Sequence, residues 1–190
     1  FSGCTELTSV VVPSSVEKIG ESAFSDCTKL SSIEIPNKIT QIKQSTFKNC
    51  SALTTITIPE SVVNIGTYAF SDCVAITTVN IPNSVTDIGE YAFYNCSKLT
   101  AVTIPTQITT LKASTFENCS ALGSVNLNEG LEKIEANAMK NCGGLSNVVI
   151  PNTVTTIGES AFSGCTNIIN LTVGTNVSNV DANACYGCEY

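Results

Sequence analysis

The sequence contains no histidine, no arginine and no tryptophan, and its nine cationic residues are all lysines. Without histidine, neither serine nor cysteine has the imidazole base that usually activates a nucleophile, which excludes those hydrolase classes. A net charge of −7 without any basic cluster lacks the electrostatic footprint of a nucleic-acid-binding protein. It also lacks the polybasic segment that favours anionic membrane surfaces. No apolar run approaches the ~20 residues that a helix needs to span a bilayer.

Cysteine is abundant, and nine of the ten cysteines recur at an interval of 23 residues. These nine are Cys4, Cys27, Cys50, Cys73, Cys96, Cys119, Cys142, Cys165 and Cys188. The six prolines all occupy one column of this period: Pro13, Pro36, Pro59, Pro82, Pro105 and Pro151. A fixed period of this length is typical of solenoid proteins, in which each repeat packs only on its neighbours.

Each repeat combines two kinds of hydrophobic spacing. Ile56 and Ile58 alternate with Thr55 and Thr57, the period-2 pattern that predicts a half-buried strand. Apolar residues of the segment 65–73 lie at helix-like intervals, which predicts a helical turn or a short helix behind the strand. The predicted core columns of this repeat are those of Leu53, Ile56, Ile58, Val62, Ile65, Ala69, Phe70 and Cys73.

The repeat reads L-x-x-I-x-I-P-x-x-V-x-x-I-G-x-x-A-F-x-x-C-x-x and resembles the leucine-rich repeat of the BspA-like, or Treponema-type, class. The resemblance covers the whole chain. It implies a right-handed, curved leucine-rich-repeat solenoid of α/β type with about eight repeats of 23 residues. A parallel β-sheet is expected on the concave face, with short helical or 3-10 turns on the convex side.

We expect residues 1–190 to form a single solenoid domain. Phe1 falls in the middle of a repeat, which favours a segment of a longer protein. Residues 173–190 are expected to be a degenerate last repeat, because Gly174, Asp181 and Cys185 occupy consensus columns there.

The cysteine column has three interpretations. Disulfide bonds between repeats are disfavoured, because the strand spacing of ~4.8 Å exceeds the ~3.5–4.5 Å between the Cβ atoms of a bridge. Metal ligation is weakly supported, since Cys185-x-x-Cys188 is the only close pair and histidine is absent. We predict a buried column of free thiols, with a terminal Cys185–Cys188 disulfide as an open alternative. No catalytic, metal-ligating or cofactor-binding residue is predicted.

Several asparagines form glycosylation sequons. Three Asn-Cys-Ser sequons share one column, and two further sequons lie near the carboxyl end: Asn49, Asn95, Asn118, Asn170 and Asn176. Glycosylation applies only in an organism with a eukaryotic secretory route. The alternative is that asparagine is a turn residue, because Asp26, Asp72 and Gly164 occupy the first column in other repeats.

The two outward columns of the strands form a broad, nearly uncharged face of hydroxyl and amide groups, which suits sugars or peptide backbone. The candidate binding residues are Ser32, Glu34, Thr55, Thr57, Thr78, Asn80, Thr103, Ser124 and Asn126. Repeat proteins commonly bind ligands on such a sheet. The alternative is that β-branched threonine simply suits a solvent-facing strand.

The BspA-like resemblance implies a cell-surface or secreted protein that adheres to host matrix, host cells or other microbes. The expected partner is a host extracellular protein or glycan, with no nucleic acid, no membrane insertion and no enzymatic activity. Unpaired terminal strands would allow end-to-end or edge self-association. The alternative function is a passive spacer or stalk that presents another domain.

Overall fold

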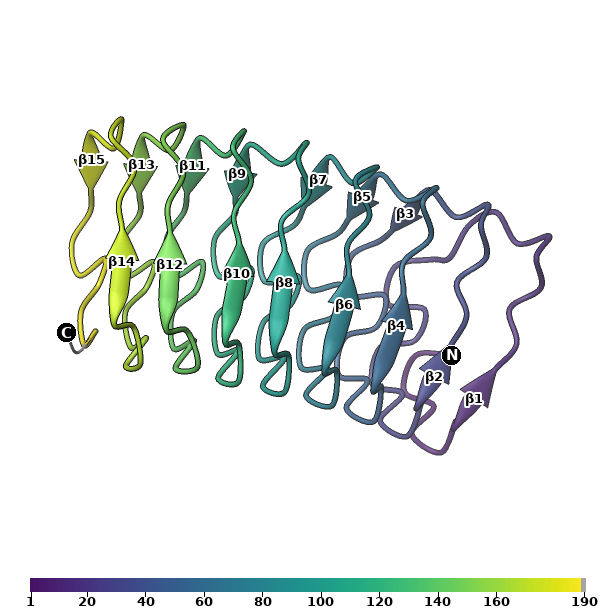
Figure 1. Ribbon diagram of the computed structural model, residues 1–190. Coiled ribbons are helices and arrows are strands. Elements are labelled where there is room, and N and C mark those ends of the chain that lie inside the picture. The colour runs from purple at the N-terminus through teal and green to yellow at the C-terminus, as the bar shows by residue number, and fades with distance from the viewer. Residues whose placement is uncertain (189–190) are drawn as a thin grey trace.

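The computed structural model describes residues 1–188, which form a solenoid of parallel strands with successive repeats side by side (Figure 1). The front sheet is formed by β1 (Ser9–Val10), β2 (Ser32–Ile33), β4 (Thr55–Thr57), β6 (Thr78–Asn80), β8 (Ala101–Thr103), β10 (Ser124–Asn126), β12 (Asn147–Val149) and β14 (Asn170–Thr172). The second ladder is formed by β3 (Gln41–Ile42), β5 (Asn64–Ile65), β7 (Asp87–Ile88), β9 (Thr110–Leu111), β11 (Lys133–Ile134), β13 (Thr156–Ile157) and β15 (Asn179–Val180). Within residues 1–188 the chain therefore completes about seven turns.

Within each row, paired neighbours are parallel with a register of one repeat: the front sheet pairs as β1–β2, β4–β6, β8–β10 and β12–β14, and the second ladder as β3–β5–β7 and β9–β11–β13–β15. Thr55 lies opposite Thr78 in the front sheet, and Ile65 lies opposite Ile88 in the second ladder. Each sequence column thus becomes a row of adjacent residues along the solenoid, which confirms the predicted parallel sheet. The second ladder was not predicted, because two-residue strands such as β5 are too short for an alternation pattern.

The side between the second ladder and the next front strand, represented by residues 66–73, is called the turn side. Helical or 3-10 turns were predicted here, and that prediction is wrong, because residues 1–188 contain turns and strands but no helix. For the same reason, this part of the chain contains no helix that could span a membrane. The physical reason is backbone handedness: Tyr68 and Asp72 have φ angles of 57° and 62°. A left-handed residue every fourth position interrupts the run of negative φ angles that a right-handed helix requires.

Backbone hydrogen bonds on the turn side alternate between local and inter-repeat partners. The amide of Ala69 donates to the carbonyl of Gly66 within the repeat at 3.1 Å. The neighbouring amide of Tyr68 donates to the carbonyl of Glu90 in the next repeat, also at 3.1 Å. The amide and carbonyl groups of the turn side therefore form hydrogen bonds without a helix. Such pairing is needed because unpaired backbone groups are costly to bury against the core.

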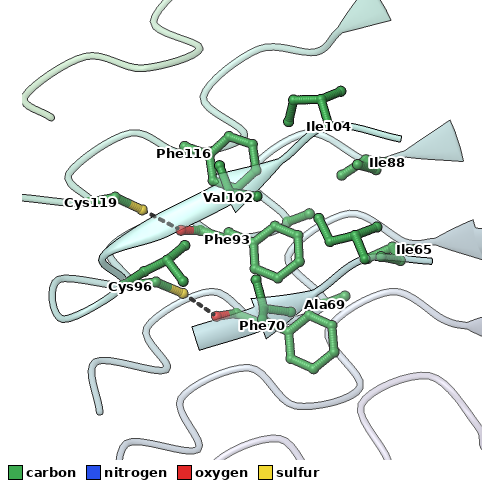
Figure 2. Packing of buried hydrophobic residues seen from close by; sticks show 14 of the residues in the cluster. Ile65, Ala69, Phe70, Ile88, Phe93, Cys96, Val102, Ile104, Phe116 and Cys119 are labelled. Carbon is green, nitrogen blue, oxygen red and sulfur yellow. Dashed lines mark hydrogen bonds between the residues drawn. The ribbon is translucent and has the colours of Figure 1, made fainter. Parts of the chain in front are cut away.

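The core runs along the solenoid axis as continuous columns of apolar side chains. All eight core positions predicted for the repeat at 53–73 are confirmed, with at most 6% of each residue exposed. The rings of Phe70, Phe93 and Phe116 follow one another at centroid distances of 5.3 Å (Figure 2). Met139 occupies the next position of this column and is also fully buried.

The cysteine column is buried from Cys27 to Cys165, as predicted, whereas Cys4 is exposed. Each buried thiol donates to a phenylalanine or methionine carbonyl of the preceding repeat. The Sγ of Cys96 lies 3.3 Å from the carbonyl oxygen of Phe70 (Figure 2). The thiols therefore satisfy backbone acceptors inside the core, which accounts for their regular spacing.

Two repeats lack the proline of the consensus, and the residues that replace it still fit the same fold. Asn128 replaces proline, and its Nδ2 donates to the carbonyl of Pro105 at 2.7 Å while its Oδ1 accepts from the amide of Gly130. In the last repeat, Gly174 occupies the proline column because a Cβ there would overlap the carbonyl of Pro151. That repeat still pairs through β15, although Val180 is 58% exposed. Of the predicted degenerate repeat 173–190, residues 189–190 lie outside the described chain.

Candidate binding surface

The front face consists of the outward side chains of the front sheet. In β4, Thr55 and Thr57 are exposed while Ile56 points into the core, and β6 and β8 repeat this alternation. All nine predicted binding residues are exposed: Ser32, Glu34, Thr55, Thr57, Thr78, Asn80, Thr103, Ser124 and Asn126.

The register brings most of these residues into adjacent pairs. Thr55 pairs with Thr78, and Thr57 lies between Asn80 on one side and Glu34 on the other. Thr103 and Asn126 pair in the same way. Two predicted residues pair with small side chains instead, Ser32 with Ser9 and Ser124 with Ala101. Since paired strands lie about 4.8 Å apart, the hydroxyl and amide groups form a nearly continuous polar row.

The hydroxyl groups of the front face differ from those in the turns between the front sheet and the second ladder. Within residues 1–188, the side chains of Thr55, Thr57, Thr78, Asn80, Thr103, Ser124 and Asn126 take part in no hydrogen bond. In contrast, Ser61 Oγ donates to the carbonyl of Ile39 at 2.7 Å, and Ser84 Oγ donates to that of Val62 at the same distance. These seven front-face side chains are therefore available to a ligand, whereas Asn170 Nδ2 donates to Asn147 Oδ1 at 2.8 Å farther along the face, and the two serines stabilise the stack.

Charge is scarce on the front face. Glu34 is the one charged residue of its two outward columns. Together with Ser32 and Val11, Glu34 lines a shallow hollow between β1 and β2. Val11 is 91% exposed, so this end of the front face offers an apolar contact beside one carboxylate.

A second surface feature, not predicted from the sequence, lies on the turn side. Tyr68, Tyr91 and Tyr94 form the tyrosine cluster, in which the rings of Tyr68 and Tyr91 stack at 4.8 Å. Tyr94 is tilted by 60° against Tyr91 at 5.8 Å. All three rings are half-buried. The sequence signal was available, because three of the five tyrosines of the chain lie within residues 68–94.

The backbone position of two of these tyrosines is unusual. Tyr68 and Tyr91 both have a φ angle of 57°, where the other repeats carry serine or asparagine. The left-handed conformation costs a non-glycine residue about 1–2 kcal/mol, and bulky side chains are outliers there. Stacking of one aromatic pair contributes about 0.5–1.5 kcal/mol beyond the burial of the rings. Both positions therefore hold a bulky side chain where the left-handed backbone disfavours one.

The tyrosine cluster has a charged border. Lys48 of the preceding repeat places its Nζ over the ring of Tyr68, 5.2 Å from the centroid. Burial, together with the nearby Tyr91 and Glu90, raises the pKa of Tyr68. Within residues 1–188, the carboxylates of Glu90 and Glu117 are in no ion pair and no hydrogen bond. Glu117 takes the position of Tyr94 in the next repeat.

The sequon column on the turn side is a ladder of hydrogen-bonded side chains. Nδ2 of Asn49 donates to Asp26 Oδ1 at 3.0 Å, and Nδ2 of Asn95 donates to Asp72 Oδ1 at 2.9 Å. Each asparagine of the column has a positive φ angle, such as 58° at Asn49. These contacts are those of a turn residue that tolerates the left-handed conformation.

Several thiols of the cysteine column have a pKa that burial raises. Burial raises the pKa of Cys50 and of Cys165 to about 12, and burial raises the pKa of Cys188 to about 11. The nucleophile and metal ligand is the thiolate, which such pKa values suppress at neutral pH. Among the described residues, no three histidine, cysteine, aspartate or glutamate side chains gather as a metal site would require.

Comparison with known proteins agrees with this architecture. The family model of the BspA type leucine rich repeat region matches residues 1–100 and 86–190, which together cover the chain. No curated protein matches the sequence.

Solved bacterial structures share the fold. A leucine-rich repeat protein of T. pallidum is 24% identical with a TM-score of 0.65, over 91% of this chain and 73% of that one. A leucine-rich cell surface protein of Faecalibacterium prausnitzii is 28% identical with a TM-score of 0.63, over 91% and 61%. A leucine-rich repeat protein of Eubacterium ventriosum is 22% identical with a TM-score of 0.77, over 96% and 60%. The repeat consensus, the stacked parallel strands and the family match together establish that this chain belongs to the BspA-type leucine-rich repeat family.

Proposed function

We propose that the front face is a non-catalytic binding surface for an extracellular protein or glycan. In this proposal the chain is part of a cell-surface or secreted protein that adheres to host matrix, host cells or other microbes. The observation that carries the proposal is the row of exposed hydroxyl and amide groups without hydrogen-bond partners, represented by Thr55, Thr57, Thr78 and Asn80.

Hydroxyl and amide groups both donate and accept hydrogen bonds, so the row suits sugar hydroxyls and peptide backbone equally well. The absence of charge over most of the face favours a neutral ligand surface, because a buried unpaired charge would oppose binding. A parallel sheet also holds the row rigid, which lowers the entropic cost of association.

The location is supported by family membership and by the F. prausnitzii structure, which is described as a cell surface protein. Since this chain spans 61% of that protein, the activity of a whole protein of this kind remains part of the proposal.

The test is a binding screen of the purified chain against extracellular-matrix proteins and a glycan panel. The front-face variant carries Thr55→Glu, Thr57→Glu, Thr78→Glu and Asn80→Glu. We expect it to lose binding, because four carboxylates desolvated against a neutral ligand oppose the complex.

A matched control separates the site from the added charge. It carries four glutamates at exposed positions outside the front columns, by Thr40→Glu, Gln41→Glu, Gln107→Glu and Thr109→Glu. Retained binding by this control, with loss in the front-face variant, supports the proposal. Equal binding by both variants, or no binding by the parent chain, would favour a spacer instead.

A further inference from the structure

The tyrosine cluster lies outside the front face and has a chemistry of its own. Tyr68 and Tyr91 come from residues between β5 and β6 and between β7 and β8, at the turns rather than on the front strands. In all the remaining repeats, the residue at this left-handed position is serine or asparagine. A bulky residue retained in a sparsely populated conformation points to a role beyond folding.

The electrostatics of the cluster favour a cation. The face of an aromatic ring carries negative potential, and one face of Tyr68 already holds the ammonium group of Lys48 at 5.2 Å. Glu90 and Glu117 border the rings and, among the described residues, have no cationic partner. By contrast, Asp87 nearby forms an ion pair with Lys112. Half-buried rings bordered by two carboxylates are therefore a complementary surface for positive charge.

We propose that the tyrosine cluster is a second binding site, which takes an arginine or lysine side chain presented by a basic segment of a protein partner. The cation stacks on the exposed parts of Tyr91 and Tyr94, and the carboxylates of Glu90 and Glu117 pair with it. Arginine fits best, because its planar guanidinium stacks on rings and pairs with carboxylates at once. The net charge of −7 adds long-range attraction for such a segment.

The test measures binding of a fluorescein-labelled peptide of alternating glycine and arginine to the whole chain by fluorescence anisotropy. The key variant carries Tyr68→Ser, Tyr91→Ser and Tyr94→Ser, which leaves the net charge unchanged. Serine is the native residue at the equivalent positions Ser45, Ser114 and Ser71, so the variant keeps the turn conformation. We expect it to bind about tenfold more weakly, from the loss of cation–π contacts.

Two controls define the chemistry. The phenylalanine variant, with Tyr68→Phe, Tyr91→Phe and Tyr94→Phe, keeps the aromatic faces and should bind within about twofold of the parent chain. A peptide with citrulline in place of arginine keeps the shape without the charge and should not bind.

Each outcome decides the proposal. Loss of binding in the serine variant, with retention in the phenylalanine variant, supports the site. Equal binding of the serine variant would show general attraction to an acidic chain and overturn the proposal. So would equal binding of the citrulline peptide, the absence of binding by the parent chain, or binding of neutral oligosaccharides to the cluster in place of the cationic peptide.

Discussion

The front face and the turn side use the same small polar residues for different purposes. On the front face, Thr57 and Asn80 lie opposite each other with no side-chain hydrogen bond in the described chain. On the turn side, Asn95 donates to Asp72 at 2.9 Å, and Thr115 donates to the carbonyl of Lys112 at 2.8 Å. A residue type therefore does not reveal its role until its position in the repeat is known.

The difference follows from backbone geometry. A strand pairs its own amide and carbonyl groups, so its outward side chains have no backbone group left to satisfy. A left-handed turn leaves fewer side chains that fit, and in one column of the turn side the asparagine and aspartate side chains hydrogen-bond to the adjacent repeat, as Asn95 does to Asp72. Substitutions of hydrogen-bonded side chains on the turn side should therefore change stability, whereas substitutions of front-face side chains should leave stability nearly unchanged.

The largest effect is expected in the core beneath the turn side. Phe70→Ala removes a fully buried ring from the phenylalanine column and should lower the free energy of unfolding by about 3–5 kcal/mol. Urea denaturation followed by circular dichroism measures this loss. Phe70→Met is the matched control, since Met139 fills the same column, and should cost less. An unchanged denaturation midpoint for Phe70→Ala would contradict the packing described here.

Two asparagines, one on the turn side and one on the front face, test this difference in stability. Asn95→Ala loses the hydrogen bond to Asp72 and places alanine at a φ angle of 57°, so we expect a loss of about 1–3 kcal/mol. Asn80→Ala on the front face should change stability by at most about 0.5 kcal/mol. Thermal denaturation of both variants distinguishes them.

A glycine substitution separates the two causes at Asn95. Asn95→Gly removes the same hydrogen bond but adopts the left-handed conformation freely, as Gly164 does in the same column with a φ angle of 74°. Its loss should therefore be smaller than that of Asn95→Ala. Equal losses for alanine and glycine would mean that the backbone conformation contributes nothing.

Much of this comparison could be predicted from the sequence. The 23-residue period, the core columns and the front sheet could be predicted because the pattern recurs. A position that is ambiguous in one repeat is resolved by the equivalent positions of the others. The helical prediction failed at 65–73, because helix-like spacing of Ile65, Ala69 and Phe70 also fits a chain that turns by left-handed residues. Hydrophobic spacing records which residues face the core and does not record the sign of φ.

The candidate sites were predicted unevenly for a related reason. The front-face residues were found from their column alone, but whether Thr57 or Ser61 is hydrogen-bonded depends on the adjacent repeat and required the structure. The tyrosine cluster was missed because it departs from the consensus. Tyr68 and Tyr91 are neighbours only through stacking of repeats, and Lys48 contacts the ring of Tyr68 from a third repeat.

A smaller effect is expected from acid. Hydrogen bonds from Asn49 and Ser25 lower the pKa of Asp26 below its ordinary value of 3.8. A lowered pKa in the folded state stabilises the protein above the unfolded-state pKa, and this contribution is lost as pH falls through the folded-state pKa. The carboxyl group is exposed, so we expect less than about 1 kcal/mol, measured by urea denaturation from pH 6 to about pH 3.

Asp26→Asn should remove that part of the pH dependence without unfolding the turn. Asn118 already occupies the equivalent position and accepts a hydrogen bond from Asn141 at 2.8 Å. The reverse substitution, Asn118→Asp, should introduce a similar dependence. If Asp26→Asn followed the pH profile of the parent chain, the hydrogen bond to Asn49 would not act on the carboxylate.

The smallest effect on stability is expected where the largest effect on binding is proposed. Thr57→Val removes a hydroxyl without a partner from a strand that suits both residues, so the free energy of unfolding should stay within about 0.5 kcal/mol. Thr115→Val is its counterpart on the turn side, where a fully buried hydroxyl donates to Lys112, and should cost about 1 kcal/mol. Denaturation of the two variants under one condition tests the contrast directly. If Thr57→Val lowered the free energy of unfolding as much as Thr115→Val, the front-face hydroxyl groups would stabilise the fold. Their position on the front face would then not indicate a binding surface.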